Sequence, residues 1–89
     1  MALQKDVKET VERNMELMLM QVKTYLPFLR IAFPGVSNLP EFCFNLMLGN
    51  ALSTFMSQYA LRFQTPSESD FAEFGTLASK YGEKVNELF

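Results

Sequence analysis

A run of twenty residues without a charged side chain, from Phe42 to Leu61, most constrains how this chain can fold. The run reads FCFNLMLGNALSTFMSQYAL, and its nearest charged neighbours are Glu41 and Arg62. It reads as a helix over about residues 40–63, with Asn38 as N-cap and Glu41 three residues later. A surface helix normally turns a charged or polar side to water, and this helix has no charged side. We therefore expect it to be covered, by its own chain or by a second one.

The length of this run also raises the question of a membrane span. Twenty uncharged residues satisfy the length that a bilayer requires. However, Asn45, Asn50, Gln58 and several hydroxyl side chains make insertion unfavourable, and no cluster of Lys and Arg flanks the run. We therefore favour a helix packed against protein over one that spans a membrane.

Two further helices are predicted, one on each side of this run. Before it, apolar residues recur at spacings of three and four over about residues 3–26, which indicates one buried stripe. The stripe consists of Leu3, Val7, Val11, Met15, Met18, Val22 and Tyr25. Pro27 cannot continue a helix without losing a hydrogen bond. We expect either a kink there or a break followed by a short helical segment at 27–33.

The last helix is predicted over about residues 66–88, with Thr65 as its cap and Pro66 as its first residue. Its apolar stripe consists of Phe71, Phe74, Leu77, Ala78, Tyr81, Val85 and Leu88. For the middle helix we predict a core face of Phe44, Leu48, Ala51, Leu52, Phe55, Met56, Tyr59 and Phe63. The chain is thus expected to form a single domain over 1–89, an all-α antiparallel bundle of three main helices.

Small residues form a row on two of these helices. The row on the middle helix consists of Leu46, Gly49, Ser53, Ser57 and Ala60, and the row on the last helix of Gly75, Ser79 and Gly82. Small residues at this spacing let two helices approach closely. Two interpretations remain: the rows pack against each other within the chain, or the middle row meets its own copy across a two-fold axis. Either way we predict helix–helix or dimer contact along the middle row.

The chain has more apolar side chains than a small domain can easily bury. Of its 89 residues, 36 are Leu, Ile, Val, Met, Phe or Tyr. Small domains have a limited core of their own, and oligomerisation is a common remedy. Leu17 lies at the edge of its stripe, while Met20 and Met47 fall outside theirs. We predict these three residues to form an exposed patch for a partner.

The composition argues against most catalytic mechanisms and metal sites. The chain has no histidine and one cysteine, Cys43, so the commonest general base is missing and one chain cannot assemble a zinc or iron–sulfur site. Cys43, flanked by two Phe residues, is best read as a small buried hydrophobe. The net charge is −2 and the basic residues do not cluster, which argues against a nucleic-acid partner. We expect no enzymatic activity, no metal and no cofactor.

Two classes of function remain. The first is a protein–protein interaction module: a small dimeric adaptor, regulator or inhibitor that acts through apolar helix surface. The second is a bundle that holds an apolar small molecule or acyl chain in its interior, with Asn45 or Tyr59 as a polar handle. The amino terminus MALQKDVKET lacks the pattern of a signal peptide, so we expect a cytoplasmic protein.

Overall fold

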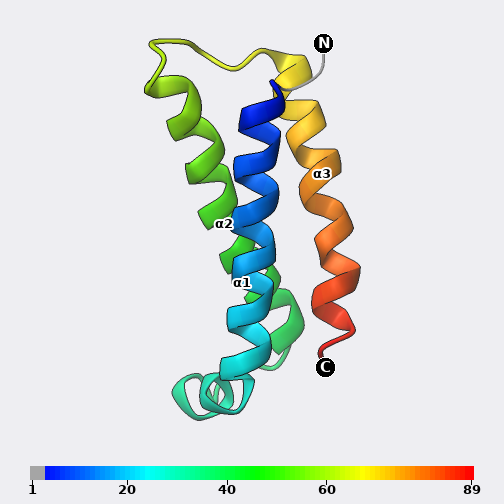
Figure 1. Cartoon of the computed structure of the whole chain (residues 1–89). Coiled ribbons are helices and arrows are strands. Elements are labelled where there is room, and N and C mark those ends of the chain that lie inside the picture. The colour runs from blue at the N-terminus through cyan, green and yellow to red at the C-terminus, as the bar shows by residue number, and fades with distance from the viewer. Residues whose placement is uncertain (1–3) are drawn as a thin grey trace.

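The computed structural model describes residues 4–89 and confirms the small all-α bundle. Its elements are α1 (Lys5–Ala32), α2 (Leu39–Ala60) and α3 (Glu68–Asn86), and residues 4–89 contain no strand. Figure 1 shows α2 running antiparallel to both α1 and α3. The bundle is elongated, with extents of 41 × 22 × 19 Å. Leu3, predicted in the first stripe, lies outside the described residues.

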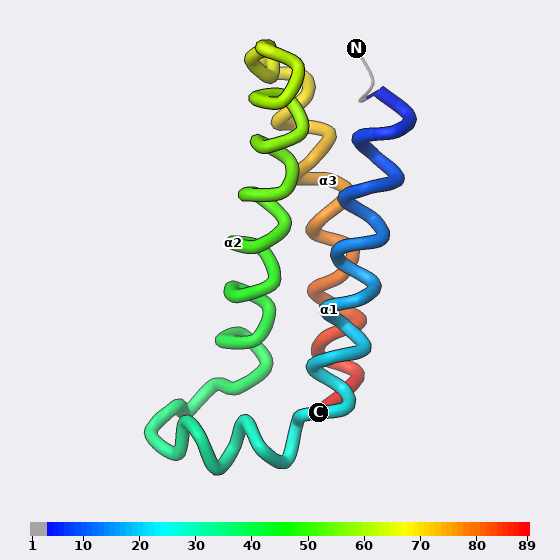
Figure 2. Tube along the Cα trace, turned by 60° about the vertical axis from the view of Figure 1, so that its left-hand side comes forward, coloured from blue at the N-terminus to red at the C-terminus, as the bar shows by residue number. Residues whose placement is uncertain are grey.

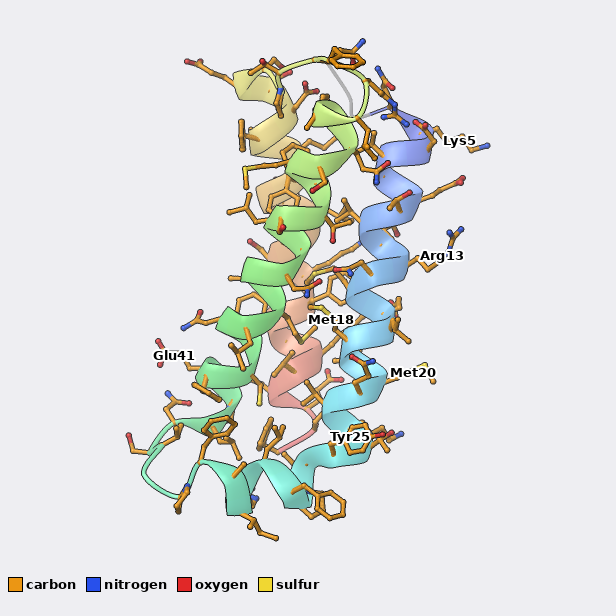
Figure 3. All side chains as sticks on the ribbon, turned by 90° about the vertical axis from the view of Figure 1, so that its left-hand side faces the viewer. Lys5, Arg13, Met18, Met20, Tyr25 and Glu41 are labelled. Atoms are coloured by element: carbon orange, nitrogen blue, oxygen red, sulfur yellow. The ribbon has the colours of Figure 1, made fainter. Side chains whose placement is uncertain are left out.

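The first helix does not break at proline. α1 continues through Pro27 to Ala32, but Figure 2 shows that its axis turns sharply near its C-terminal end. Pro27 has no N–H to donate to the carbonyl of Lys23, and its ring crowds that carbonyl, which bends a helix. The predicted kink is therefore confirmed, and the alternative of a break is wrong. Tyr25, predicted in the core, lies at the corner in Figure 3 and is exposed.

The core is built from one buried row on each helix. The rows are Val7, Val11 and Met15 on α1; Leu39, Cys43, Met47, Ala51, Phe55 and Tyr59 on α2; and Phe74, Leu77, Ala78, Tyr81 and Val85 on α3. Phe55 joins α2 to α3, because its ring centroid lies 4.7 Å from that of Phe74 and 5.3 Å from that of Phe71. Tyr59 packs edge-on against the same ring at 5.3 Å.

The buried row of α2 differs from the predicted core face. Met47 is only 2% exposed, so its prediction as an exposed residue is wrong. Met56 and Phe63, predicted in the core, are 44% and 99% exposed. The reason is that an uncharged helix has little contrast between its sides, so its pattern does not show which side turns inward. Contact with α1 and α3 selects that side.

The helix starts show one confirmed and one displaced cap. The Asn38 side chain accepts a hydrogen bond from the Glu41 N–H at 3.2 Å, as predicted. For α3 the predicted cap Thr65 is wrong, because Ser67 caps this helix. Ser67 Oγ accepts from the Asp70 N–H at 3.1 Å, and the Asp70 carboxylate accepts from the Ser67 N–H at 2.9 Å. The latter hydrogen bond is the main reason why the pKa of Asp70 is lowered.

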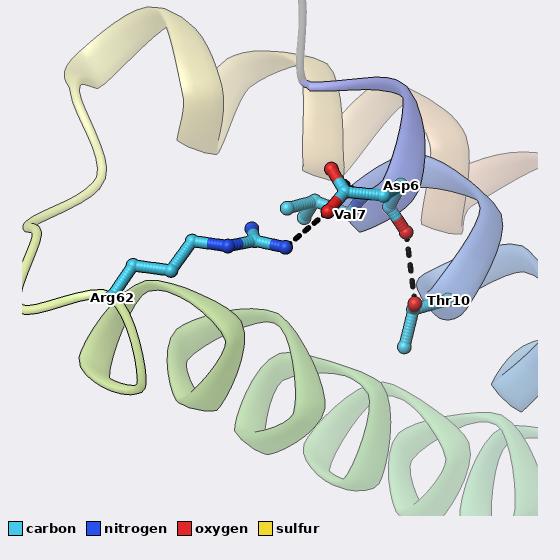
Figure 4. Close-up of polar contacts among 4 residues, drawn as sticks. All are labelled: Asp6, Val7, Thr10 and Arg62. Atoms are coloured by element: carbon cyan, nitrogen blue, oxygen red, sulfur yellow. Dashed lines mark hydrogen bonds and ion pairs between the residues drawn. The ribbon is translucent and has the colours of Figure 1, made fainter.

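An ion pair joins the start of α1 to the residues that follow α2, at the end of the bundle opposite the bend in α1. Figure 4 shows the Arg62 guanidinium against the Asp6 carboxylate. The other carboxylate oxygen of Asp6 accepts from the Val7 N–H at 2.9 Å, and its backbone carbonyl accepts from the Thr10 hydroxyl at 2.8 Å. Arg62, which follows the uncharged run in the sequence, thus links the start of α1 to the residues after α2.

α2 ends in a motif that normally uses glycine. The Gln64 N–H donates to the Tyr59 carbonyl at 2.9 Å, and the Phe63 N–H donates to the Ala60 carbonyl at 3.0 Å. These two bonds form a Schellman motif, whose left-handed position is occupied here by Phe63 with φ 54°. The Phe63 side chain is also 99% exposed. This residue therefore bears backbone strain without a packing gain inside the chain.

We expect Phe63→Gly to raise the free energy of unfolding by about 1 kcal/mol, because glycine adopts the left-handed conformation without the steric cost of a Cβ. Urea unfolding monitored by circular dichroism measures the change. Phe63→Ala is the matched control: it removes the ring but keeps the Cβ, so stability should change little. A loss of stability in both Phe63→Gly and Phe63→Ala would show that the ring makes a stabilising contact.

A polar contact joins α1 to α3 at the edge of the core. The Tyr81 hydroxyl donates to Glu16 Oε1 at 2.9 Å, and Lys84 Nζ lies 3.3 Å from the same oxygen. The hydrogen bond from Tyr81 is the main reason why the pKa of Glu16 is lowered. Burial, followed by the hydrogen bond to Glu16, raises the pKa of Tyr81. The phenol thus stays protonated as the donor.

We expect Tyr81→Phe to lower the free energy of unfolding by about 1 kcal/mol at neutral pH, the usual contribution of one hydrogen bond. Because the pKa of Glu16 is lower in the folded state, its contribution is complete above the unfolded-state pKa and is lost as pH falls through the folded-state value. The difference between wild type and Tyr81→Phe should therefore shrink in acid.

Urea unfolding at neutral pH and at about pH 3, below the ordinary glutamate pKa, measures this difference. Glu12→Gln serves as control, because Glu12 lies 3.9 Å from Lys80 in a solvent-accessible ion pair of small energetic value. An undiminished effect of Tyr81→Phe in acid would contradict the assigned role of Glu16.

Candidate functional site

The predicted row of small residues on α2 faces away from the rest of the chain. All of its members are exposed, namely Leu46, Gly49, Ser53, Ser57 and Ala60. A Cβ built on Gly49 would meet no atom of the described chain within 4 Å outside its own helix backbone and immediate neighbours. The same holds for Gly75 on α3, and Ser79 is exposed. The interpretation that the two rows pack together within the chain is therefore wrong.

One member of the α3 row does meet α2. A Cβ on Gly82 would lie 3.4 Å from the ring of Phe44, which is ordinary van der Waals contact. The neighbouring Ser79 hydroxyl donates to the Gly75 carbonyl at 2.7 Å, within its own helix. The α3 row is thus partly explained by contact with an aromatic ring, whereas the α2 row has no such explanation.

The exposed side of α2 has no charge beyond Glu41, which is exposed in the first turn. We call it the outer face of α2 and define it by Asn45, Leu46, Gly49, Asn50, Ser53, Met56, Ser57 and Ala60, all of which are exposed. Its polar groups are amides and hydroxyls, which cost less to remove from water than charges do. Depletion of charge is typical of the centre of protein–protein interfaces. The outer face is therefore suited to contact with another protein.

A groove of about 300 Å³ lies beside the outer face, between α1 and α2. Its walls are Met18, Gln21, Val22 and Leu29 from α1, and Cys43, Leu46, Met47 and Asn50 from α2. Figure 3 shows Met18 between the two helices. Leu29 follows the bend at Pro27, so the turned end of α1 contributes to the wall. Leu46 and Asn50 belong to both surfaces, which makes the groove and the outer face continuous.

An amide pair lies at this junction of α1 and α2. Asn14 Nδ2 donates to Asn50 Oδ1 at 3.1 Å. Within the part of the chain that the structure describes, Asn14 Oδ1 is shielded from water and accepts no hydrogen bond. Most buried polar atoms in proteins have a partner. Among residues 4–89, Asn14 Oδ1 is therefore an unpaired acceptor below the surface, next to the Asn50 side chain that lines the groove.

The predicted patch of Leu17, Met20 and Met47 does not come together. Leu17 and Met20 are 53% and 65% exposed, so their predicted exposure is confirmed, while Met47 is buried and lines the α1–α2 groove. Met20 borders a different hollow, between α1 and α3, with Lys84 and Leu88. That Leu17 and Met20 contact a partner stays a prediction.

Cys43 is free, buried and 1% exposed, and burial raises the pKa of its thiol. Its position in the wall of the groove gives it no charged neighbour that would favour a thiolate. Across residues 4–89, no three His, Cys, Asp or Glu side chains are placed to hold a metal ion. In the same range, no helix combines the length and the hydropathy that crossing a membrane requires.

Comparisons of the chain with protein families, with curated proteins and with solved structures find no match. The functional assignment therefore depends on the residues of this chain alone.

We expect Cys43 to react slowly with a thiol reagent such as DTNB in the native protein and rapidly in urea, because its sulfur is buried and its pKa is raised. Absorbance of the released thiolate measures the rate. The control is Ser79→Cys in a Cys43→Ala background, whose exposed thiol should react quickly without urea. Fast native labelling of Cys43 would show that the α1–α2 groove opens to solvent down to its wall.

Proposed function

We propose that this chain is a non-enzymatic protein–protein interaction module, a small helical dimer that acts as an adaptor, regulator or inhibitor. Its binding surface is the outer face of α2 together with the adjoining groove. One observation carries the proposal: α2, which has no charged residue after Glu41, buries only one side and leaves the other side exposed. Burying an uncharged face against protein costs little desolvation and removes its apolar groups from water.

The bundle has more exposed surface than a compact domain of this length. The chain exposes 5859 Å², whereas a compact folded monomer of 10.2 kDa exposes about 5300 Å². Its radius of gyration is 14.2 Å against about 12 Å for a compact domain of this length. The surplus of roughly 550 Å² reflects the elongated shape of the bundle.

Only some of the exposed apolar side chains support the proposal of a binding surface. Single exposed apolar residues are normal on protein surfaces and need no partner. Leu46 and Met56, which are 56% and 44% exposed, differ because they lie on one continuous uncharged face. The proposal therefore rests on the outer face of α2 and not on the number of exposed apolar residues.

The proposed chemistry and compartment follow from the same residues. The free Cys43 is compatible with a reducing cytoplasm, which we propose as the location. Its raised pKa argues against use as a nucleophile. The exposed carboxylate Glu16 has a lowered pKa, unlike a general acid, whose pKa is raised by burial.

The α1–α2 groove supports a second candidate function, the binding of an apolar small molecule or acyl chain. Its volume of about 300 Å³ is at the lower end for ligand pockets. The polar handles would be Gln21 and Asn50, which line the groove. The handles predicted from sequence do not line it: Asn45 is exposed on the outer face, and Tyr59 packs against Phe55. A fatty acid that raises Tm in proportion to ln(1 + [L]/Kd) would support this alternative.

We expect the wild-type chain to sediment as a dimer and Gly49→Leu to shift it towards monomer, because a leucine there would hold a second helix away from the outer face. The variant should still fold, since the space around Gly49 is open within the chain and leucine favours helix more than glycine does. Sedimentation velocity over a range of concentrations measures the shift, and circular dichroism checks the fold.

Gly75→Leu is the matched control, because Gly75 is equally open but lies on α3. It should leave the dimer unchanged. A wild-type chain that is monomeric at every concentration would refute the homodimer, and equal effects of the two variants would place the contact elsewhere than the outer face.

A further inference from the structure

We infer that the turned end of α1 binds the surface of a bilayer that contains anionic lipids, with two apolar side chains inserted among the headgroups and basic side chains beside the phosphates. The turned end consists of residues 27–32, which begin at the bend. It is a surface separate from the outer face of α2, so this inference goes beyond the proposed function. Its position in the fold, its exposed apolar side chains and its charge support this binding.

The turned end lies across one end of the bundle, where a flat surface can reach it. In Figure 1 and Figure 2 it forms the extremity of the molecule, and α2, α3 and the rest of α1 all lie on the same side of it. The bundle measures 41 Å along its longest axis and 22 Å or less across. It can therefore stand on a membrane with the turned end in contact and the rest of the chain in water.

The turned end exposes apolar side chains on one of its sides. Phe28 and Ile31 are 63% and 76% exposed, and residues three apart are neighbours on a helix face. Leu29, on another side, packs against the core and lines the groove. Tyr25, 55% exposed, extends the apolar row across the bend, because its ring centroid lies 6.4 Å from that of Phe28. A tyrosine ring with its polar hydroxyl is typical of the headgroup region of a bilayer.

The charges carried by this part of the chain are positive. Between Glu16 and Glu41 the sequence has no Asp or Glu, and its charged side chains are Lys23 and Arg30. Both are exposed, and neither forms an ion pair within residues 4–89. Arg30 lies instead over the ring of Phe89, with its guanidinium carbon 5.8 Å from the ring centroid. The guanidinium is thus held at this end of the bundle with its charge unpaired among residues 4–89.

Two acidic residues border this end of the bundle. Glu41, exposed in the first turn of α2, projects to the side of the bundle in Figure 3. Glu87, which follows α3, lines a hollow between α1 and α3 together with Lys23. Of the two basic residues, Lys23 therefore has a carboxylate in its surroundings, whereas Arg30 belongs to the turned end itself. We expect Arg30 to contribute more to binding.

An anionic bilayer matches this combination of side chains. Its negative surface attracts basic residues, and segments that lie in the interface combine Lys or Arg with large apolar side chains. The chain as a whole has a net charge of −2, so the same surface repels the rest of the bundle and favours contact through this end. Such binding takes place in the interface and does not need a helix that crosses the bilayer.

Flotation with lipid vesicles tests the inference. We expect the wild-type chain to bind phosphatidylcholine vesicles that contain about 30% phosphatidylserine, and to bind pure phosphatidylcholine vesicles more weakly, because only the former have a negative surface. Binding to the anionic vesicles should weaken in high salt, which screens the attraction between charges.

Two variants of the turned end separate the contributions of charge and apolar contact. Arg30→Gln should weaken binding to the anionic vesicles about fivefold, which corresponds to the loss of one basic residue at such a surface. Phe28→Gln with Ile31→Gln should weaken binding at least about tenfold, because it removes the apolar side chains that leave water. All three positions are exposed, so the variants should fold, and circular dichroism checks this.

Each variant has a matched control elsewhere in the chain. Arg13→Gln removes an equal charge from an exposed position of α1, far from the turned end in Figure 3. Leu61→Gln with Phe63→Gln removes two apolar side chains that are 75% and 99% exposed after α2, at the opposite end of the bundle. Both controls should bind the anionic vesicles like wild type.

The outcomes separate this inference from the proposed function. Weaker binding of the turned-end variants with unchanged binding of the controls supports the inference. A wild-type chain that does not bind the anionic vesicles at low salt overturns it, and so does an equal loss in the controls, which places the contact elsewhere. If the wild type does not bind vesicles and Phe28→Gln with Ile31→Gln turns a dimer into a monomer in sedimentation, this end contacts a second copy, which also overturns the inference. The sedimentation of Gly49→Leu tests the proposed function independently, because the turned end contains no residue of the outer face.

Discussion

Each helix of a three-helix bundle can bury only the sides that touch the other two, and this geometric limit governs α2. Its row from Leu39 to Tyr59 lies against α1 and α3, with Phe55 stacked on Phe74. The opposite side must then face outward, whatever residues it holds. Here it holds no charge after Glu41, which is the condition under which contact with a second protein costs least desolvation. The proposed function follows from this arrangement: the residues of α2 are suited to burial on all sides, but α1 and α3 cover only one side.

The bend at Pro27 has a second consequence. A straight α1 would extend beyond the end of α2, whereas the bent helix turns Leu29 towards the N-terminal part of α2. The bend at Pro27 thus places Leu29 in the wall of the groove, whose other α1 residues precede the bend. Its wall includes Met47 and Cys43, which are almost fully buried although they line a groove that opens to the surface. The groove adjoins the outer face, so a molecule bound to the outer face would also contact the edge of the groove.

Prediction from sequence succeeded where local rules act. The stripe of Val7, Val11 and Met15 follows helical periodicity, and Pro27 bends the helix as a missing N–H requires. Asn38 caps α2 because an Asn side chain can reach the free N–H groups of the first turn. The cap of α3 was misplaced by two residues, because Thr65 and Ser67 have the same chemistry and only the observed backbone distinguishes them.

Prediction failed where contacts distant in sequence decide. The pattern placed Met56 and Phe63 inside and Met47 outside, and the structure reverses all three. Residue types alone settle that the chain is helical, that α2 carries no charge after Glu41, and that histidine chemistry is excluded, because these properties belong to residues and their near neighbours. Which side of α2 is buried, and the existence of the groove, depend on where α1 and α3 lie against it. An uncharged helix carries no signal for that placement, since all of its sides have nearly equal affinity for water.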